Sequence, residues 1–299
     1  MRTAAIGIGS NSLRLLVADR KNGQITAVLR KREGLRVFAS LNQNHEISSA
    51  MITQACTSVN MLRQAALHAG AQTVHLFATS AVRDANNQQM FADALFRETS
   101  LRLEILSGET EAKLSFIGAT DDTHSGMIDI GGGSTEIVIG RRNTIAFACS
   151  LQAGAVRLYR QIPIHCREDA LRAKQTVKAL IVPYQAEIEQ LKTPTEWVGV
   201  GGTLTALASC VQNIDWKDHD RIHGFIAAQS DVRRITETLA GMTQDQRRML
   251  HSIPPDREDI IVHGFAILLG CMETLRIPKI KVSRKTNLDG YLTLMTADE

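Results

Sequence analysis

Apolar and polar positions along the chain form short apolar runs first and segments of helical spacing later. Thr3–Ile8 is apolar and stopped by glycine, which predicts a buried strand. Two more strands are expected at Leu13–Asp19 and Gln24–Arg32, with a turn at Lys21-Asn22-Gly23 between them. Apolar residues then recur at helical spacing from Ser48 to His68. Beyond this helix, the pattern predicts strands at Thr73–Ala78 and Leu103–Leu106, and helices at Asn86–Glu98 and Glu109–Gly118.

The same plan restarts after a short polar stretch, Thr120–Ser125. Three strands in a row are expected at Gly126–Ile130, Glu136–Gly140 and Thr144–Ser150. Helices predominate afterwards, around the strands Trp197–Val200 and Ile280–Val282; they are expected at Glu168–Leu191, Leu204–Val211, Ser230–Ala240, Gln244–Leu250 and Arg257–Leu275. We therefore predict two domains, residues 1–122 and 123–299, and leave open that the C-terminal segment packs back on the first.

Two twelve-residue segments repeat one pattern at an offset of 122 residues, Ile6–Val17 and Ile128–Ile139. Their apolar ends match, Gly9 falls on Gly131, and Ser12 falls on Ser134. Each copy is expected to form a strand, a tight turn of glycine and serine, and a second strand. A repeat at a fixed offset of this size indicates a duplicated domain.

The composition of these two turns suits phosphate binding, with a simple hairpin turn as the alternative. Glycine lets the backbone approach a ligand closely, successive N–H groups form a nest for an anion, and hydroxyl groups add donors. The predicted phosphate-binding residues are Gly9, Ser10, Asn11 and Ser12 in the first copy, and Gly131, Gly132, Gly133, Ser134 and Thr135 in the second.

One position separates the two copies. Asp129 ends a buried strand beside the second turn, where a carboxylate could hold Mg²⁺ directly or through water. A structural role without a partner is disfavoured there, because an unpaired buried charge is costly. The counterpart of Asp129 in the first copy is Gly7, which has no carboxylate.

Composition narrows the class of protein. The 299 residues are 44% hydrophobic and 22% charged, as in globular proteins, and only 4% are aromatic, which disfavours a surface that stacks on nucleobases. A net charge of +3 is too small to indicate DNA binding. No signal peptide and no apolar run of membrane-spanning length is recognised, and the five dispersed cysteines suit free thiols. We expect a cytoplasmic protein with neither nucleic acid nor membrane as a partner.

Six segments, in order along the chain, resemble motifs of the exopolyphosphatase/guanosine pentaphosphate phosphohydrolase (Ppx/GppA) family, within the actin–Hsp70–sugar kinase fold superfamily. The resemblance covers essentially the whole chain, and the ordered set is far more specific than any single motif. The segments are Ile6–Ser12, Ala78–Ala85, Leu106–Ala112, Asp129–Glu136, Gly199–Thr203 and Arg257–Gly264.

The resemblance implies an α/β fold of two duplicated ribonuclease H-like (actin-like ATPase) domains with an active-site cleft between them. It implies a hydrolase that releases terminal phosphate from inorganic polyphosphate or guanosine pentaphosphate, so that polyphosphate or guanosine penta- or tetraphosphate would be the partner. Glu111 would activate water, and Arg83 would clamp the transferred group. Asp129 and Glu136 would hold Mg²⁺ or Mn²⁺. Gly201 and Gly202 would join the phosphate-binding set, and a homodimer is an open alternative for the oligomeric state.

Three positions depart from the family pattern. Gly7 replaces a usual acid in the first turn; Arg284 and Leu288 replace a usual acid and a usual arginine near the C-terminal end. A catalytically weakened regulator that binds phosphate or an alarmone is therefore the alternative, and a kinase ranks below it. For single residues the simpler alternatives are that Glu111 and Glu136 face solvent and that Arg83 pairs with Asp84.

Overall fold

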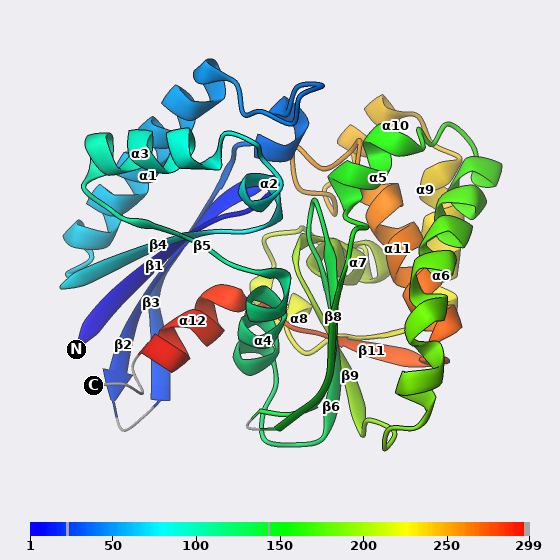
Figure 1. Ribbon diagram of the computed structural model, residues 1–299. Helices are drawn as coiled ribbons and strands as arrows, with labels where there is room; N and C mark the ends of the chain where they lie inside the picture. The colour runs from blue at the N-terminus through cyan, green and yellow to red at the C-terminus, as the bar shows by residue number, and fades with distance from the viewer. Residues whose placement is uncertain (22–23, 143, 296–299) are drawn as a thin grey trace. The chain divides into compact units, whose positions relative to one another are not determined.

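The computed structural model describes residues 1–21, 24–142 and 144–295, and the chain divides into two compact units (Figure 1). The first unit comprises Met1–Gly118 together with helix α12 (Asn287–Met295), and the second comprises Ala119–Thr286. The sequence predicted a boundary between residues 122 and 123. The structure instead starts the second unit at Ala119, and it assigns the last helix to the first unit, in agreement with the possibility left open for the C-terminal segment.

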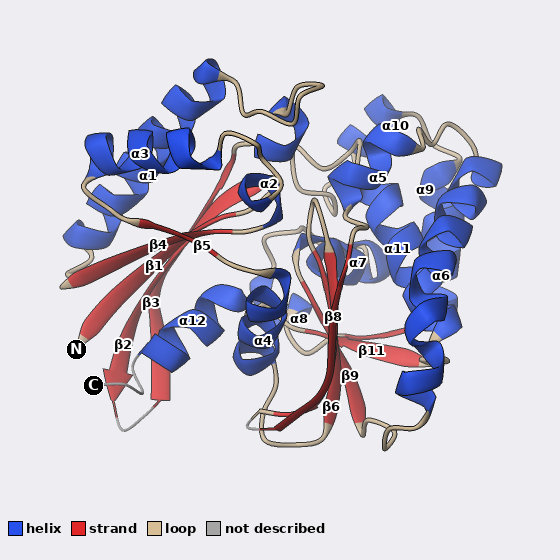
Figure 2. Ribbon diagram, in the orientation of Figure 1, coloured by secondary structure: helices blue, strands red, loops and turns tan. Residues whose placement is uncertain are grey.

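The first unit is built on a five-stranded sheet of order β3-β2-β1-β4-β5 (Figure 2). β1, β2 and β3 form an antiparallel ribbon, whereas β4 and β5 run parallel to β1. The elements are β1 (Arg2–Ile8), β2 (Ser12–Lys21), β3 (Gln24–Gly34), the 3₁₀-helix η1 (Val37–Ser40), α1 (Ser49–His68), β4 (Thr73–Ala78), α2 (Ser80–Arg83), α3 (Gln88–Thr99), β5 (Leu103–Ile105) and α4 (Gly108–Ala119).

The second unit repeats this topology in a six-stranded sheet of order β10-β11-β9-β6-β7-β8. β6, β7 and β8 form the antiparallel ribbon, and β9 and β11 are the parallel strands. The elements are β6 (Ser125–Ile130), β7 (Thr135–Arg141), β8 (Thr144–Leu151), α5 (Ala155–Gln161), α6 (Arg167–Glu189), β9 (Glu196–Val200), α7 (Gly202–Gln212), α8 (His219–Ile222), β10 (Ile226–Ala228), α9 (Gln229–Ala240), α10 (Gln244–Arg248), α11 (Ile261–Thr274) and β11 (Lys279–Val282). The shared strand order confirms that the domain is duplicated.

The structure differs from the predicted elements in a few places. The long helix expected from Arg257 starts at Ile261 instead. Its apolar residues lie on every side of the helix, so that their spacing gives no signal for the first helical residue. Helices α5 and α12 were not predicted. The turn expected at Asn22 and Gly23 lies outside the described residues.

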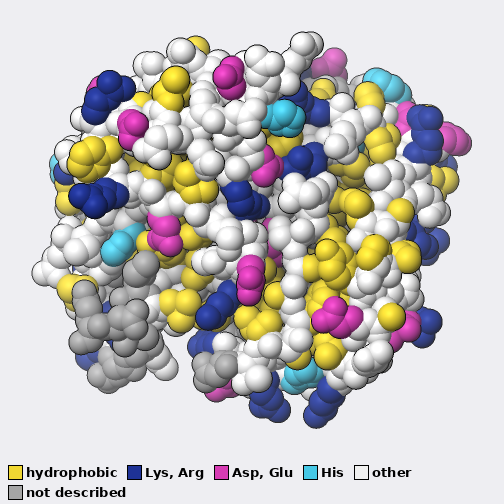
Figure 3. Space-filling view, in the orientation of Figure 1, with side chains coloured by type: hydrophobic (Ala, Val, Ile, Leu, Met, Phe, Trp, Pro, Cys, Tyr) yellow, Lys and Arg dark blue, Asp and Glu magenta, His cyan; other side chains and the backbone are white. Residues whose placement is uncertain are grey.

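Helix α11 is the centre of the second unit's core, and every residue from Ile261 to Met272 is buried. It packs against α6, α9 and α5. None of the helices within the described ranges is long and apolar enough to cross a bilayer. On the face of the molecule drawn in Figure 3, basic and acidic side chains are interspersed, in keeping with the small net charge of +3.

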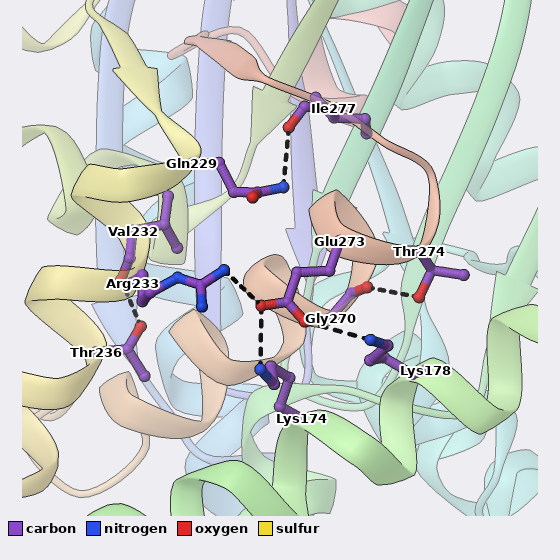
Figure 4. A network of polar contacts seen from close by, with 10 residues as sticks. All are labelled: Lys174, Lys178, Gln229, Val232, Arg233, Thr236, Gly270, Glu273, Thr274 and Ile277. Carbon is purple, nitrogen blue, oxygen red and sulfur yellow. Dashed lines mark hydrogen bonds and ion pairs between the residues drawn. The ribbon is translucent and has the colours of Figure 1, made fainter.

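One carboxylate at the end of α11 forms ion pairs with side chains of two other helices (Figure 4). Glu273 accepts hydrogen bonds from Lys174 (3.0 Å) and Lys178 (3.3 Å) on α6, and from Arg233 (3.0 Å) on α9. Burial raises the pKa of Glu273, but the hydrogen bonds and charges of the two lysines outweigh it, so that the net pKa lies below its ordinary value. The ionised carboxylate is thus the form that holds α6, α9 and α11 together.

Replacing Glu273 by glutamine should destabilise the second unit, because three cations would lose their shared anion. We expect a loss of about 1–3 kcal/mol, which corresponds to roughly 2–4 °C in melting temperature per kcal/mol for a unit of this size. The depressed pKa makes this contribution present at neutral pH and lost as the pH falls below the unfolded value of about 4.5. Scanning calorimetry at pH 7 and at pH 4 measures both effects.

The matched control is Glu237→Gln on the exposed side of α9. An equal melting temperature for Glu273→Gln and this control at pH 7 would contradict the proposed role of the network.

Candidate functional site

The two glycine-serine turns have the same backbone geometry. In the first unit the Gly9 N–H donates to the Ser12 carbonyl over 3.0 Å, and in the second the Gly131 N–H donates to the Ser134 carbonyl over 3.0 Å. Each turn joins strands of equivalent register, with Ile8 opposite Leu13 and Ile130 opposite Thr135. The repeat seen in the sequence is therefore also a repeat of conformation.

The first turn is held from behind by the segment that follows β3. The Ser10 carbonyl accepts from the Phe38 N–H (3.0 Å), and the Asn11 carbonyl accepts from the N–H groups of Leu35 (3.2 Å) and Arg36 (3.1 Å). In a planar trans peptide the carbonyl and the following N–H point in opposite directions. The N–H groups of Asn11 and Ser12 therefore point away from this backing segment.

The second turn is held from behind by the start of α5. The carbonyls of residues 131–133 all accept hydrogen bonds from it. The donors are Ala155 N (3.0 Å), Val156 N (2.8 Å), Arg157 N (3.0 Å) and Arg157 Nε (2.6 Å). By the same argument, the N–H groups of Gly132, Gly133 and Ser134 point away from α5. Successive N–H groups that converge in this way form an anion-binding nest.

This contact with α5 requires Gly154. A Cβ atom at this position would stand 2.3 Å from the backbone of Gly132 and of Gly133. Any side chain at residue 154 would therefore push the start of α5 away from the second turn.

The first unit gathers three predicted site elements at the carboxyl ends of its parallel strands. The Gly9–Ser12 turn follows β1, Arg83 ends the short helix after β4, and Glu111 lies in the first turn of the helix after β5. This edge is where open α/β sheets bind ligands.

Arg83 and Glu111 form a direct ion pair. The Arg83 Nη1 atom donates to Glu111 Oε2 over 3.0 Å and to the Leu106 carbonyl over 2.8 Å. Glu111 is 7% exposed, whereas Glu109 on the same helix is exposed. The structure thus rejects a solvent-facing Glu111, and it pairs Arg83 with Glu111.

Three side chains in this unit have buried polar atoms without a hydrogen-bond partner among the described residues. The atoms are Thr3 Oγ1, Arg83 Nη2 and both polar atoms of the Asn11 side chain, which is 5% exposed. Because native structures rarely leave buried polar groups unpaired, Arg83 Nη2 and the amide nitrogen of Asn11 are candidate donors to oxygen atoms of a ligand.

The predicted metal ligands of the second unit lie side by side. Asp129 on β6 is directly opposite Glu136 on β7, so their Cβ atoms are about 4.5–5.5 Å apart. Glu136 is 1% exposed, contrary to the alternative that it faces solvent, and it accepts a hydrogen bond from Ser150 Oγ (2.8 Å).

This pair suits Mg²⁺ only in part. Among the described residues no three acidic, histidine or cysteine side chains come together as a metal site. Two carboxylates that leave the remaining positions to water and phosphate oxygens are a typical Mg²⁺ environment. The residues present therefore fit a magnesium ion bound jointly by protein and phosphate.

The positions equivalent to this acidic pair are occupied differently in the first unit. Gly7 lies opposite Arg14, at the places of Asp129 and Glu136. A Cβ atom at Gly7 would stand 3.0 Å from the Phe77 ring and 3.5 Å from Leu288. Two departures from the family pattern, Gly7 and Leu288, therefore lie near one another, and a side chain at residue 7 would require the Phe77 ring to shift by a few tenths of an ångström.

The hydroxyl group of Thr135 has a partner within the second unit, and the prediction that Thr135 binds phosphate stays a prediction. The Thr135 hydroxyl is fully buried and donates to the Ala153 carbonyl, so that its proton is not available to a phosphate group.

Gly201 and Gly202 lie at the start of α7, with Asp129 Oδ1 close to Gly201. A Cβ atom at Gly202 would stand 2.2 Å from the guanidinium of Arg257, which is 6% exposed. The sequence placed Arg257 in a family-like segment but gave no signal for this contact.

Replacing Gly154 by alanine should weaken phosphate binding by the second turn, because the added methyl group displaces the helix that fixes the direction of the three N–H groups. We expect the affinity for inorganic triphosphate to fall at least about tenfold, or about 1.4 kcal/mol. Calorimetric titration measures it. Gly241→Ala is the control, since a Cβ atom there meets nothing closer than 3.6 Å; equal affinity of the two variants would contradict the nest.

Comparison with known proteins identifies the family of the chain. The model of the Ppx/GppA phosphatase family matches residues 16–296. Exopolyphosphatase 2 of Mycobacterium tuberculosis is 30% identical over 310 residues, which cover 97% of each chain. Exopolyphosphatase 1 of Mycobacterium bovis is 26% identical over 291 residues, which cover 94% of this chain and 84% of that protein.

Solved structures agree on the fold. A crystal structure of an exopolyphosphatase from Cytophaga hutchinsonii superposes with a TM-score of 0.89 at 23% identity, and it covers 100% of this chain and 98% of its own. The Ppx/GppA family member of Aquifex aeolicus superposes with a TM-score of 0.83 at 23% identity, with the same coverage. These matches confirm the two-domain, actin-like α/β fold. The chain belongs to the Ppx/GppA phosphatase family.

Proposed function

We propose that this protein is an exopolyphosphatase, which releases orthophosphate from the end of inorganic polyphosphate. The observation that carries the proposal is the buried ion pair of Glu111 and Arg83, on the sheet edge that also bears the Gly9–Ser12 turn. Relatives named exopolyphosphatase that align over almost the whole chain support the choice of substrate.

In the proposed reaction Glu111 accepts a proton from a water molecule, whose oxygen attacks the terminal phosphorus in line with the bridging oxygen. The bond to that bridging oxygen breaks, and a chain shorter by one phosphate leaves. Arg83 Nη1 orients the carboxylate of Glu111, and Arg83 Nη2 would donate to an oxygen of the transferred group. A planar arginine fork can make both contacts at once.

The backbone turns would hold the phosphate chain. Their N–H groups are fixed in direction before the substrate binds, so that they stabilise phosphate charge without the cost of reorganisation. Asn11, with its buried and unpartnered amide, would supply one more donor beside the first turn.

Asp129 and Glu136 would hold Mg²⁺ or Mn²⁺. The bound ion would neutralise charge on the phosphate oxygens. Guanosine pentaphosphate also ends in a phosphoanhydride that the same residues would hydrolyse, so we propose it as a second substrate.

A regulator that binds phosphate without hydrolysing it is the alternative. It is favoured by the absence of an acid from the first copy, where Gly7 lies beside the apolar side chains of Phe77 and Leu288. The buried pair of Glu111 and Arg83 favours the enzyme, because a protein that only binds anions gains nothing from a buried carboxylate beside its site.

Glu111→Gln should abolish phosphate release but retain binding. Glutamine keeps the shape of the side chain and cannot accept the proton, so kcat for release of phosphate from polyphosphate should fall by about 10²–10⁴-fold. A phosphate-release assay on polyphosphate and on guanosine pentaphosphate measures turnover, and calorimetry with inorganic triphosphate measures binding.

Glu109→Gln is the matched control, because Glu109 lies on the same helical turn but is exposed. Release of phosphate by neither the unmodified protein nor this control, with binding intact, would establish the regulator instead. Full turnover by Glu111→Gln would remove Glu111 as the base.

Asp129→Asn should raise the Mg²⁺ concentration needed for half-maximal phosphate release by roughly tenfold, since one anionic ligand is lost. Chelation of divalent cations should stop release by the unmodified protein. Asp122→Asn, in the exposed segment before β6, serves as the control. An unchanged Mg²⁺ requirement in Asp129→Asn would show that the ion is held elsewhere.

A further inference from the structure

The second unit contains a cavity of about 620 Å³ at the opposite end of its sheet from the glycine turn. It is lined by the connection from α6 to β9, by the connection from α11 to β11, and by the first residues of both strands. Gly131 and Gly201, in contrast, follow the carboxyl ends of β6 and β9 (Figure 1). Gly201 follows Trp197 by four positions along an extended strand, a span of about 13 Å. The cavity is therefore separate from the candidate site described above.

An aromatic ring forms part of the cavity wall. Trp197 lies beside Gly126 on the neighbouring strand, and a Cβ atom at Gly126 would stand 2.5 Å from the indole. The absence of a side chain at Gly126 thus lets the ring pack directly on the backbone of β6. The half-buried indole lines the cavity with its remaining surface, among the apolar side chains of Ile188, Leu191 and Leu275.

The lining of the cavity contains more basic residues than acidic residues around this apolar wall. Lys281 pairs with Glu196 (3.2 Å), and Arg276 pairs with Glu189 (3.5 Å). The other two basic residues of the lining, Lys192 and Lys279, form no ion pair within the part of the chain that the structure describes. The lining therefore carries an excess of two positive charges beside an aromatic ring.

We propose that this cavity binds a planar aromatic ligand that carries phosphate groups, of the nucleotide class. Stacking of a base on an aromatic side chain contributes about 1–3 kcal/mol, and the two lysines without acidic partners would pair with the phosphates. The cavity volume lies within the usual range of small-molecule sites, about 300–1,000 Å³. A purely apolar ligand would form no ion pair with the two lysines, and an inorganic anion would form no stacking contact with the indole ring.

Tryptophan fluorescence tests the proposal at the site itself. The chain has two tryptophans, so that Trp216→Phe leaves Trp197 as the single reporter. ATP is the probe, in buffer without divalent cations. We expect a saturable change in Trp197 fluorescence with ATP, and at least about tenfold weaker binding of adenosine and of inorganic triphosphate, because each supplies only half of the recognition.

Removal of the two lysines distinguishes this cavity from any other nucleotide site. In the Trp216→Phe background, Lys192→Ser with Lys279→Ser should weaken ATP binding by at least about tenfold. Lys31→Ser with Lys217→Ser, two exposed lysines outside the cavity, should leave it unchanged. The absence of a saturable signal, equal binding of ATP and triphosphate, or unchanged binding in the Lys192/Lys279 variant would each overturn the proposal. None of these outcomes depends on whether the protein hydrolyses polyphosphate.

Discussion

The structure of both half-sites depends on one constraint, the planarity of the peptide bond. In each turn the carbonyls are fastened from behind, and the N–H groups that follow them must then point to the other side. The fastening segment has the same origin in both units, since it follows the third strand of the antiparallel ribbon: residues 35–38 after β3, and residues 153–157 after β8. A short ribbon of three strands thus fixes the turn between the first two before any ligand is bound.

Duplication preserved this backbone device while the side chains around it diverged. The acidic pair Asp129 and Glu136 of the second unit corresponds to Gly7 and Arg14 in the first. The first unit fills the space beside Gly7 with Phe77, Leu288 and, stacked on Phe77, Tyr291. The turn backbone proposed to bind anions is therefore common to both copies, whereas the paired carboxylates belong to the second and the Glu111–Arg83 pair to the first. This divergence supports the proposal that the second unit holds the metal ion and the first unit carries the general base.

The sequence alone predicted the repeat, the strands around each turn and the residues that form each turn. These features are contained in twelve-residue patterns of apolar residues and glycine. It was insufficient for contacts that arise only when distant segments meet. The backing of the second turn by α5 depends on Gly154, and α12 packs so closely on α4 that a Cβ atom at Gly290 would stand 1.9 Å from the Leu114 carbonyl. The hydrogen bond from the Thr135 hydroxyl to the Ala153 carbonyl could not be predicted for the same reason, because the two residues are distant in the sequence.

If the Glu111–Arg83 pair acts beside the Gly9–Ser12 turn as proposed, the protein removes phosphate units from the end of a polyanionic chain. The distribution of products from polyphosphate of a single defined length tests it most directly, with the reaction sampled from its first turnovers onward and resolved by gel electrophoresis. Orthophosphate is expected from the first samples, together with chains that shorten from the end. Fragments of intermediate length without early orthophosphate, or intact chains despite measurable binding, would contradict it.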